Sequence, residues 1–462
     1  MISFNKRRNT LEQETYHYEL QERAEPYLFR ETFPYVQPPK IPFNHRHVPM
    51  DPPDEIWITD TTFRDGQQAR PPFTVRQIVD IYTMLHRLGG PNGVIRSCEF
   101  FLYSSNHKKA IQACLELGFR YPEITGWIRA RKEDFKLVRQ MGLQETGILT
   151  SVSDYHIFLK LRKTRREAME SYLDIVRAAL EAGIIPRCHL EDITRADFYG
   201  FVVPFVQELR RLAEEAKMPV KVRACDTLGY GVTYPGASMP RSVQGIVYGL
   251  VHHAGVPSEW LEWHGHNDFY KVLVNAATAW LYGCAAANGT MLGIGERTGN
   301  APIEGLVFEY MGLRGTDNGM QPQVITELAQ YFEKECGHLV PPHQPFVGRD
   351  FNVTRAGIHA DGLMKDEEIY NIFDTDALLN RPVAVAISDT SGTAGIAHWI
   401  NSYFQLGPEL RLEKSHSGVA QIAAAIAKEY EDGRTTTISN QEMEAMVRQF
   451  IPELSSPELG PA

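Results

Sequence analysis

The sequence predicts an α/β protein built around a (β/α)8 TIM barrel, with an N-terminal arm and a C-terminal helical region. From Glu55 onward, eight short apolar runs alternate with polar turns and with longer stretches of helical spacing. Polar or ionisable residues stand at the end of every run, which is where the active site of such a barrel lies. We therefore expect an extended arm over residues 1–53, a catalytic barrel over 54–320 and a helical lid region over 321–462.

The arm is polar, aromatic and rich in proline, and it ends in FPYVQPPKIPFNHRHVPMDPP. Proline cannot donate a backbone hydrogen bond, so this segment can form neither a long helix nor a central strand. Two alternatives stay open. The arm is either a flexible tail or an extended segment that packs on the barrel or on a second subunit through Tyr27, Phe29, Phe33 and Tyr35.

The strands of the barrel are expected where apolar runs of about 4–8 residues end in a polar turn. A helical stretch such as TVRQIVDIYTMLHRLGG (74–90) then follows. The expected strands are EIWITD (55–60), VIRSCEF (94–100), RYPEIT (120–125), ETGILTS (145–151), IPRCHLE (185–191), VKVRACD (220–226), LEWHGH (261–266) and TMLGIG (290–295).

After residue 320 the pattern changes to that of a smaller helical region without internal repeats. A helix is expected over 324–337 and a proline-rich linker over 339–345. A loop rich in glycine and histidine should follow over 354–374, and terminal helices should include 421–430 and 441–450.

Composition excludes several classes of function. The chain has 462 residues, of which 43% are hydrophobic, and its net charge of −10 is spread out, with no basic patch that would suggest a nucleic acid partner. Six cysteines occur singly without a CxxC pair, which favours reduced thiols and a cytoplasmic protein. The N-terminal residues lack the apolar stretch of a signal peptide, and no apolar run approaches the ~20 residues of a membrane span. We expect neither export nor membrane insertion.

His264 and His266 are the sharpest local signal for chemistry. Positions i and i+2 of a strand face the same side, so both imidazoles can bind one divalent metal ion. A lone His-x-His pair is more often a pair of ordinary hydrogen-bonded histidines. Here Asp65 and Asn300 offer oxygen atoms from other strand ends, and two nitrogens with two oxygens suit Mn²⁺ or Mg²⁺, with Zn²⁺ or Co²⁺ as alternatives.

Charged residues beside this pair have two interpretations each. Arg64 is either an ion-pair partner of Asp65 or a fixed cation that stabilises a developing oxyanion. Glu191 and Asp192 are either solvated charges or, near a metal, groups that handle protons. Glu296 and Arg297 are expected to pair with each other.

Four segments in order carry a resemblance to a known family: DTTFRDGQQ (60–68), HGH (264–266), GIGERTGN (293–300) and GIHADG (357–362). Together they resemble the metal-dependent enzymes that condense acyl-CoA with 2-oxo acids, namely the isopropylmalate, homocitrate and citramalate synthases, with HMG-CoA lyase as a more distant relative. The resemblance spans residues 55 to about 400. It implies a (β/α)8 barrel in which a divalent metal binds the 2-oxo acid while acetyl-CoA supplies the nucleophilic carbon.

The resemblance also implies roles for single residues. Asp65, His264, His266 and Asn300 match the metal ligands, and Arg64 matches the residue that polarises the keto oxygen. Thr227 resembles the threonine that holds the carboxylate of the substrate, and Glu191 resembles the acid that orients the base. His359 and Tyr370 match a catalytic pair that often reaches the site from the partner subunit, which implies a homodimer.

The substrate follows from further likenesses. The segments SDYH (153–156) and EDITR (191–195) resemble those of homocitrate synthases, whose 2-oxo acid carries a second carboxylate. Arginine suits a carboxylate because its donors form a planar fork. The expected substrate-binding residues, besides Thr227, are Arg129, Arg131, Arg195, Gln68, Ser153 and His156.

Departures from the isopropylmalate synthase pattern narrow the expectation. Thr354, the SGT segment at 391–393, the QQARPPF segment at 67–73 and the long arm resemble instead the Re-face-specific citrate synthases of anaerobic bacteria. These condense acetyl-CoA with oxaloacetate to citrate, a step of the tricarboxylic acid cycle. The leucine-binding regulatory domain of many relatives would need a long further segment, so we expect no feedback by leucine.

Three alternatives stay open. The chain could be a homocitrate or 2-isopropylmalate synthase that uses another 2-oxo acid, or a lyase that runs the reverse cleavage. The lyase is disfavoured because GERTGN stands where HMG-CoA lyases carry a cysteine-bearing glycine loop. The chain could also be a barrel kept as a scaffold or binding protein.

Overall fold

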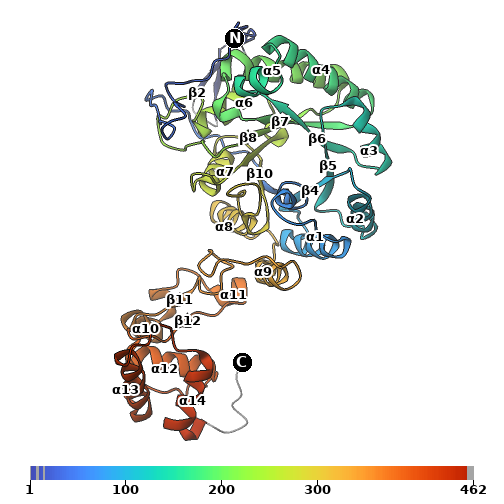
Figure 1. The fold of residues 1–462 in the computed structure, drawn as a ribbon. Helices are drawn as coiled ribbons and strands as arrows, with labels where there is room; N and C mark the ends of the chain where they lie inside the picture. Colours follow the sequence, from blue (N-terminus) through green and yellow to red (C-terminus); the bar gives the residue numbers. More distant parts are fainter. Residues whose placement is uncertain (1, 7–9, 14–15, 455–462) are drawn as a thin grey trace. The chain divides into compact units, whose positions relative to one another are not determined.

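A computed structural model describes residues 2–6, 10–13 and 16–454 (Figure 1). The chain divides into two compact units. The first holds the residues up to Val324 together with Tyr331–His338, and the second holds Ile325–Gln330 together with the residues from Leu339 onward. The expected borders at residues 53 and 320 stay predictions.

The first unit contains a closed barrel of parallel strands, which confirms the predicted fold class. The strands follow one another around the barrel in the order β10-β3-β4-β5-β6-β7-β8-β9. Their carboxyl ends therefore meet at one rim. The strands are β3 (Trp57–Asp60), β4 (Ile95–Phe101), β5 (Glu123–Ile128), β6 (Glu145–Ser151), β7 (Ile185–Glu191), β8 (Lys221–Asp226), β9 (Leu261–Gly265) and β10 (Ala286–Gly289).

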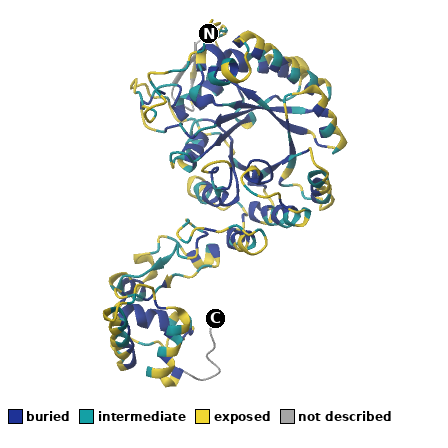
Figure 2. Ribbon diagram, in the orientation of Figure 1, coloured by how far each residue is buried: buried dark blue, intermediate teal, exposed yellow. Residues whose placement is uncertain are grey.

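Amphipathic helices surround the barrel, with their inner faces buried and their outer faces exposed (Figure 2). Helix α1 begins at a capping box in which Thr74 and Gln77 bind each other's backbone N–H, an arrangement worth about 1 kcal/mol. Among the described helices, none is both long enough and apolar enough to cross a membrane. The helices up to the end of the barrel are α1 (Val75–Gly89), α2 (Ser105–Glu116), α3 (Phe135–Gln140), α4 (Arg165–Glu181), α5 (Val203–Ala216), α6 (Val243–His252), α7 (Val272–Leu281) and α8 (Ile303–Arg314); α9 (Val324–Lys334) comes next.

The lower interior of the barrel holds a buried ion-pair network where most barrels hold branched aliphatic side chains. Arg223 donates to both carboxylate oxygens of Glu99, at 2.9 and 2.8 Å, and also binds Glu262. Arg187 binds Glu145 and lies 3.3 Å from Glu99. These charges come from five different strands and bind one another, so they face the barrel interior. We call this network inside the barrel, formed by Glu99, Glu145, Arg187, Arg223 and Glu262, the polar floor.

Two strands differ from the prediction. The eighth strand is β10, not residues 290–295, where Met291–Gly293 forms a 3-10 turn instead. The sequence of β10 is AANG, whose residues have low strand propensity, and the strand forms because it pairs with β3 and β9. The third strand starts at Glu123 and extends to Ile128, three residues beyond the expected end at Thr125.

Residues 16–53 of the arm pack on the barrel unit, which makes the flexible-tail alternative wrong for this part. The N–H of Tyr27 donates to Asp154 at 2.7 Å, and Arg165 donates to the carbonyl of Gln21 at 2.8 Å. Phe33 is buried against Tyr230, while Tyr35 is exposed. The arm begins with a two-stranded hairpin of β1 (Ile2–Asn5) and β2 (Thr10–Gln13), and residues 1, 7–9, 14 and 15 lie outside the described part.

The second unit is mainly helical, as expected, and has its own apolar core that includes Ile396, Ile400, Val419, Ile422 and Met443. The expected glycine- and histidine-rich loop contains helix α10, and helix α12 was not predicted. Its helices are α10 (Gly357–Lys365), α11 (Thr375–Leu379), α12 (Gly392–Tyr403), α13 (Ser417–Glu431) and α14 (Asn440–Phe450), and β11 (Val353–Thr354) pairs with β12 (Ala384–Val385).

Candidate metal and substrate site

Asp65, His264 and His266 come together at the carboxyl rim of the barrel. His264 lies in β9, His266 follows that strand, and Asp65 lies in a π-helical turn (Thr62–Gly66) after β3. Asp65 Oδ2 is 3.6 Å from His266 Nε2 and 3.9 Å from His264 Nε2. All three residues are buried, and one ligand atom from each lies within 4.8 Å of the others. The geometry suits a single metal ion.

Asn300 adds an oxygen beside this cluster. Its backbone pairs with that of His266 in an isolated bridge. Its side-chain Nδ2 donates to the carbonyl of Ile294 at 3.1 Å, which leaves Oδ1 as the free end of the amide. In the described part of the chain, Asn300 Oδ1, Asp65 Oδ2 and His266 Nδ1 are buried without a hydrogen-bond partner. The two unpartnered buried oxygens fit a divalent cation, while His266 faces Asp65 with its other nitrogen, Nε2.

The protonation states also fit a metal site. Burial raises the pKa of Asp65, but Arg64, His264 and His266 outweigh it and lower the pKa to about 2. Burial is the main cause that lowers the pKa of His264 to about 3, and burial also lowers that of His266. At neutral pH the cluster therefore consists of one carboxylate and two neutral imidazoles, which are the forms that bind metals.

Arg64 lies beside the cluster and is itself buried. Its Nη1 donates to Asp65 Oδ1 at 3.0 Å, and its Nε lies 3.8 Å from Glu99. Its guanidinium carbon lies 5.1 Å from the centre of the Trp127 ring. These contacts fix a cation next to the cluster, so both interpretations of Arg64, ion-pair partner and electrostatic donor, are compatible with its position.

Glu191 and Thr227 lie at the same rim, at the ends of β7 and β8. Glu191 accepts from Ser151, and its carboxylate is 3.0 Å from His156 Nδ1 and 3.2 Å from Lys160 Nζ. Burial raises the pKa of Glu191, but His156, Ser151 and Lys160 outweigh it and lower the pKa to about 2. Thr227 Oγ1 accepts the N–H of Asp192 at 2.8 Å. Ser153 donates to the side-chain carboxylate of Asp192. Glu191, Ser153 and His156 thus form one connected cluster with Asp192.

Other expected site residues have different neighbours. Arg129 is half exposed and forks onto Asp134 at 2.9 and 3.0 Å, and Arg131 is exposed. Arg195 is held by Asp192 at 2.9 Å and lies over the Tyr155 ring. Gln68 is exposed, and Arg297 pairs with Asp268, not with Glu296 as expected. His359 and Tyr370 belong to the second unit, where their rings lie 4.5 Å apart.

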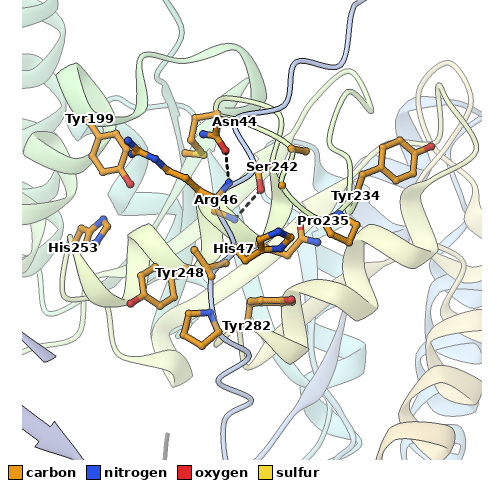
Figure 3. A pocket seen from close by; sticks show the side chains of 17 residues that line it. Asn44, Arg46, His47, Tyr199, Tyr234, Pro235, Ser242, Tyr248, His253 and Tyr282 are labelled. Atoms are coloured by element: carbon orange, nitrogen blue, oxygen red, sulfur yellow. Dashed lines mark hydrogen bonds between the residues drawn. The ribbon is translucent and has the colours of Figure 1, made fainter. Parts of the chain in front are cut away.

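A separate pocket of about 490 Å³ lies between the arm, the loop around Tyr234 and helix α6 (Figure 3). Figure 3 shows that Arg46 extends toward Tyr199 while His47 lies beside Pro235. The described residues that line this pocket include no predicted site residue. The candidate reaction centre is therefore the rim cluster and not this pocket.

Comparison with known proteins agrees with the motifs. Residues 55–331 match the HMGL-like family model. The chain is 58% identical over 462 residues to the Citrate (Re)-synthase of Syntrophus aciditrophicus, which spans 99% of this chain and 73% of that protein. It is 57% identical over 440 residues to the Citrate (Re)-synthase of Clostridium kluyveri, which spans 95% of this chain and 97% of that protein.

The chain belongs to the citrate (Re)-synthase family, within the HMGL-like proteins. The 2-phosphinomethylmalate synthase of Streptomyces hygroscopicus is also similar, with 38% identity over 439 residues, 93% of this chain and 98% of that protein. The identity of this chain to the two citrate (Re)-synthases, 57–58%, is therefore much higher than its identity to the 2-phosphinomethylmalate synthase.

Several residues that shape the site of this citrate (Re)-synthase family member were not predicted. They comprise the floor residues Arg187, Arg223 and Glu262, the rings of Trp127 and His189, and Asn288, which binds His264. A signal was present in three strands, where ionisable residues recur at every second position, as in Arg187, His189 and Glu191. Such alternation in a strand buried on both faces indicates residues that face the barrel interior.

Proposed function

We propose that this protein condenses acetyl-CoA with oxaloacetate and water to give citrate and free CoA, as a citrate synthase of the Re type. The observation that carries the proposal is the identity of 57–58% to two Citrate (Re)-synthases over nearly the whole chain. The buried cluster of Asp65, His264 and His266 supports it, because a scaffold protein has no need of such a site.

Asp65, His264, His266 and Asn300 are the residues that we assign to a divalent metal ion. Mn²⁺ is our first choice, with Mg²⁺, Co²⁺ or Zn²⁺ as alternatives, because the donor set mixes imidazole nitrogen with carboxylate and amide oxygen. When bound, such an ion polarises the carbonyl group of a 2-oxo acid and neutralises the charge that develops on its oxygen.

Arg64 and Thr227 complete the hold on the 2-oxo acid in this proposal. Arg64 is fixed by Asp65 at 3.0 Å, so its charge is in place before the reaction starts and requires no reorganisation during it. It stabilises the oxyanion that forms when the keto carbon is attacked. The Thr227 hydroxyl accepts the N–H of Asp192 at 2.8 Å and donates to the carbonyl of Cys225 at 3.4 Å, a long bond that it would exchange for the carboxylate of the substrate.

His359 is our proposed base for the acetyl methyl group, with Tyr370 as its neighbour in the second unit. Removal of a methyl proton gives the enolate of acetyl-CoA, which attacks the keto carbon of oxaloacetate. Water then hydrolyses the citryl thioester and releases CoA. Glu191 is ionised throughout the neutral range, so it can orient a histidine or an attacking water but cannot act as an acid there.

The wider assignments are proposals as well. Six free cysteines, of which five are buried, support a reducing compartment such as the cytoplasm. A homodimer would let His359 and Tyr370 act on the site of the partner subunit. Citrate formation from oxaloacetate would place the protein in the tricarboxylic acid cycle.

The first experiment is CoA release from acetyl-CoA by protein loaded with Mn²⁺, with oxaloacetate, 2-oxoglutarate, 2-oxoisovalerate and pyruvate offered separately. We expect a clear preference for oxaloacetate and citrate as the product. Preference for 2-oxoglutarate or 2-oxoisovalerate would replace the proposal by homocitrate or 2-isopropylmalate synthesis. Absence of turnover with every acid, in protein that binds no metal, would favour the scaffold alternative.

A further inference from the structure

The barrel interior next to Arg64 holds two polar rings with unused nitrogens. Trp127 Nε1 in β5 and His189 Nε2 in β7 are both buried, and neither has a hydrogen-bond partner among the described residues. His189 is 1% exposed. Most buried polar groups in native proteins are hydrogen-bonded, because an unmet one is costly. These two nitrogens are therefore open to a partner from outside the described chain.

Gly147 on β6, the strand between β5 and β7, brings these two rings to the same point. A Cβ atom at Gly147 would lie 2.6 Å from His189 Nε2 and 3.0 Å from Trp127 Cδ1. The first distance is shorter than real Cβ contacts and the second is tight, so a side chain here would have to displace the His189 ring. Glycine at this position therefore allows the rings of Trp127 and His189 to lie side by side against β6.

The two rings adjoin the proposed reaction centre through Arg64 and Glu99. Arg64 lies over the Trp127 ring at 5.1 Å, and it is the residue next to Asp65. Glu99 lies 3.6 Å from His189 Nε2 and 3.8 Å from Arg64 Nε, both longer than a hydrogen bond. Glu99 is already bound by Arg223 at 2.8 and 2.9 Å. The rings are thus available to a ligand that also reaches Arg64.

The second carboxylate of a 2-oxo dicarboxylic acid needs such a receiver. Two of the three arginines that the sequence offered for it are engaged elsewhere, since Arg129 forks onto Asp134 and Arg195 is held by Asp192. The third, Arg131, is exposed. His189 can serve as a neutral donor. Burial and the cations Arg223, Arg64 and Arg187 hold the pKa of His189 well below its usual value, so its ring is neutral and carries a single N–H.

We propose that Trp127 and His189 donate their ring N–H groups to the second carboxylate of the 2-oxo dicarboxylic acid, and that Gly147 makes this arrangement possible. The inference rests on the proposed function, because it assumes that the acid binds with its keto group toward Asp65, His264 and His266. It makes Trp127 and His189 the residues that distinguish oxaloacetate from pyruvate, which lacks the second carboxylate.

The test compares Trp127→Phe and His189→Leu with the wild type. Each variant loses one N–H to a charged group, so we expect KM for oxaloacetate to rise about 10- to 100-fold. KM for acetyl-CoA should stay within about twofold of the wild type, since that substrate makes no use of these donors. His189→Gln, which keeps an N–H donor, should recover part of the loss. Trp260→Phe, on the outer 3-10 turn Ser258–Trp260, is the matched control.

An unchanged KM for oxaloacetate in both variants would overturn the assignment, and so would an equal rise in both KM values, which indicates general distortion. Calorimetric binding of oxaloacetate to the Mn²⁺-loaded protein separates this inference from the proposed function. If the wild type binds oxaloacetate without releasing CoA, and Trp127→Phe binds it more weakly, the carboxylate assignment stands and the citrate proposal is wrong. If the wild type turns over oxaloacetate and both variants bind it as well as the wild type does, the citrate proposal stands and the carboxylate assignment is wrong.

Discussion

His264 donates its Nδ1–H to Asn288 Oδ1 at 2.8 Å, and Asn288 donates its own Nδ2–H to Thr59 Oγ1 at 2.9 Å. The order of these two bonds determines the tautomer of His264. Because the amide nitrogen of Asn288 is used by Thr59, its oxygen faces the imidazole, which must then carry its proton on Nδ1. Nε2 is left as the lone-pair nitrogen on the side of Asp65. Three neighbouring strands, β9, β10 and β3, thus orient one candidate ligand.

Asn288→Ala should weaken metal binding although Asn288 touches no metal itself. The variant removes the acceptor that orients His264, and losses of this kind typically cost about 10- to 100-fold in metal affinity. Titration of the metal-free protein with Mn²⁺, followed by calorimetry, measures the effect. Asn92→Ala, in an exposed turn, is the control and should bind Mn²⁺ as the wild type does. Equal affinity in the Asn288 variant would mean that His264 is not a ligand or is oriented by other contacts.

Arg64→Ala should reduce turnover far more than metal affinity. A single preorganised donor at a developing oxyanion is worth about 10²–10³ in kcat. The assay is CoA release at saturating acetyl-CoA and oxaloacetate, with the Mn²⁺ affinity measured in parallel. Arg70→Ala, whose guanidinium binds the carbonyl of Cys336, is a nearby control. Wild-type turnover in the Arg64 variant would leave the residue only its role as an ion-pair partner of Asp65.

Asp60 makes stability depend on pH. Burial is the main cause that raises the pKa of this carboxyl from 3.8 to about 7, despite hydrogen bonds from Thr62. Between about pH 4 and pH 7 the folded state therefore binds a proton that the unfolded state has lost. Stability contributed by this group falls as pH rises through that window, by on the order of 4 kcal/mol at most.

Asp60→Asn should remove this dependence, because asparagine keeps the oxygen that accepts from Thr62 and never ionises. We expect the variant to melt at a higher temperature than the wild type at pH 8 and at a similar temperature at pH 5. Thermal unfolding followed by circular dichroism from pH 5 to pH 8 measures this. Parallel curves for the two proteins would show that Asp60 does not cause the slope.

Glu99→Gln should destabilise the barrel strongly. Loss of one partner from a buried ion pair leaves the other charge uncompensated, at a cost of about 3–5 kcal/mol. Here Arg223, which is 1% exposed, would lose one of its two anions and keep only Glu262, so the buried network would carry an excess positive charge. Urea unfolding gives the free energy directly. Glu208→Gln removes a pair with Arg211 on the outer face of α5 and should cost less than about 1 kcal/mol. Equal losses in the two variants would argue against a fully desolvated ion-pair network inside the barrel.

The sequence predicted the barrel and the residues of the rim cluster because both depend on periodicity. His264 and His266 face one side since they are two positions apart in a strand, and Asp65 follows a strand that a closed barrel brings near them. β10 was placed four residues too late because Ala286–Gly289 has little strand propensity, and only the neighbouring strands make it a strand. Pairing partners outside the segment do not show in its composition.

Side-chain direction was harder to predict than position. Arg129 does follow a barrel strand, yet its long side chain turns to Asp134, five residues later, on the exposed side. A sequence shows which strand end carries an arginine but not which of several carboxylates it binds. Asn288 was not predicted for a similar reason, since it acts on the site only through its hydrogen bond with His264. The action of His359 and Tyr370 on the rim cluster stays a prediction.

The contacts of the arm determine when it can fold during synthesis of the chain. Arg241 donates to the carbonyl of Pro39, 202 residues earlier in the chain, and Arg165 donates to that of Gln21, 144 residues earlier. A ribosome that adds about 5–20 residues per second needs roughly 10–40 seconds to make the later partner of Pro39. During that time the arm is made while part of the surface that it packs on, including Arg241, has not yet been synthesised. The first segment to be synthesised is therefore among the last to pack in its final position. Phe33 stays exposed to water, or to a chaperone, until Tyr230 has been synthesised.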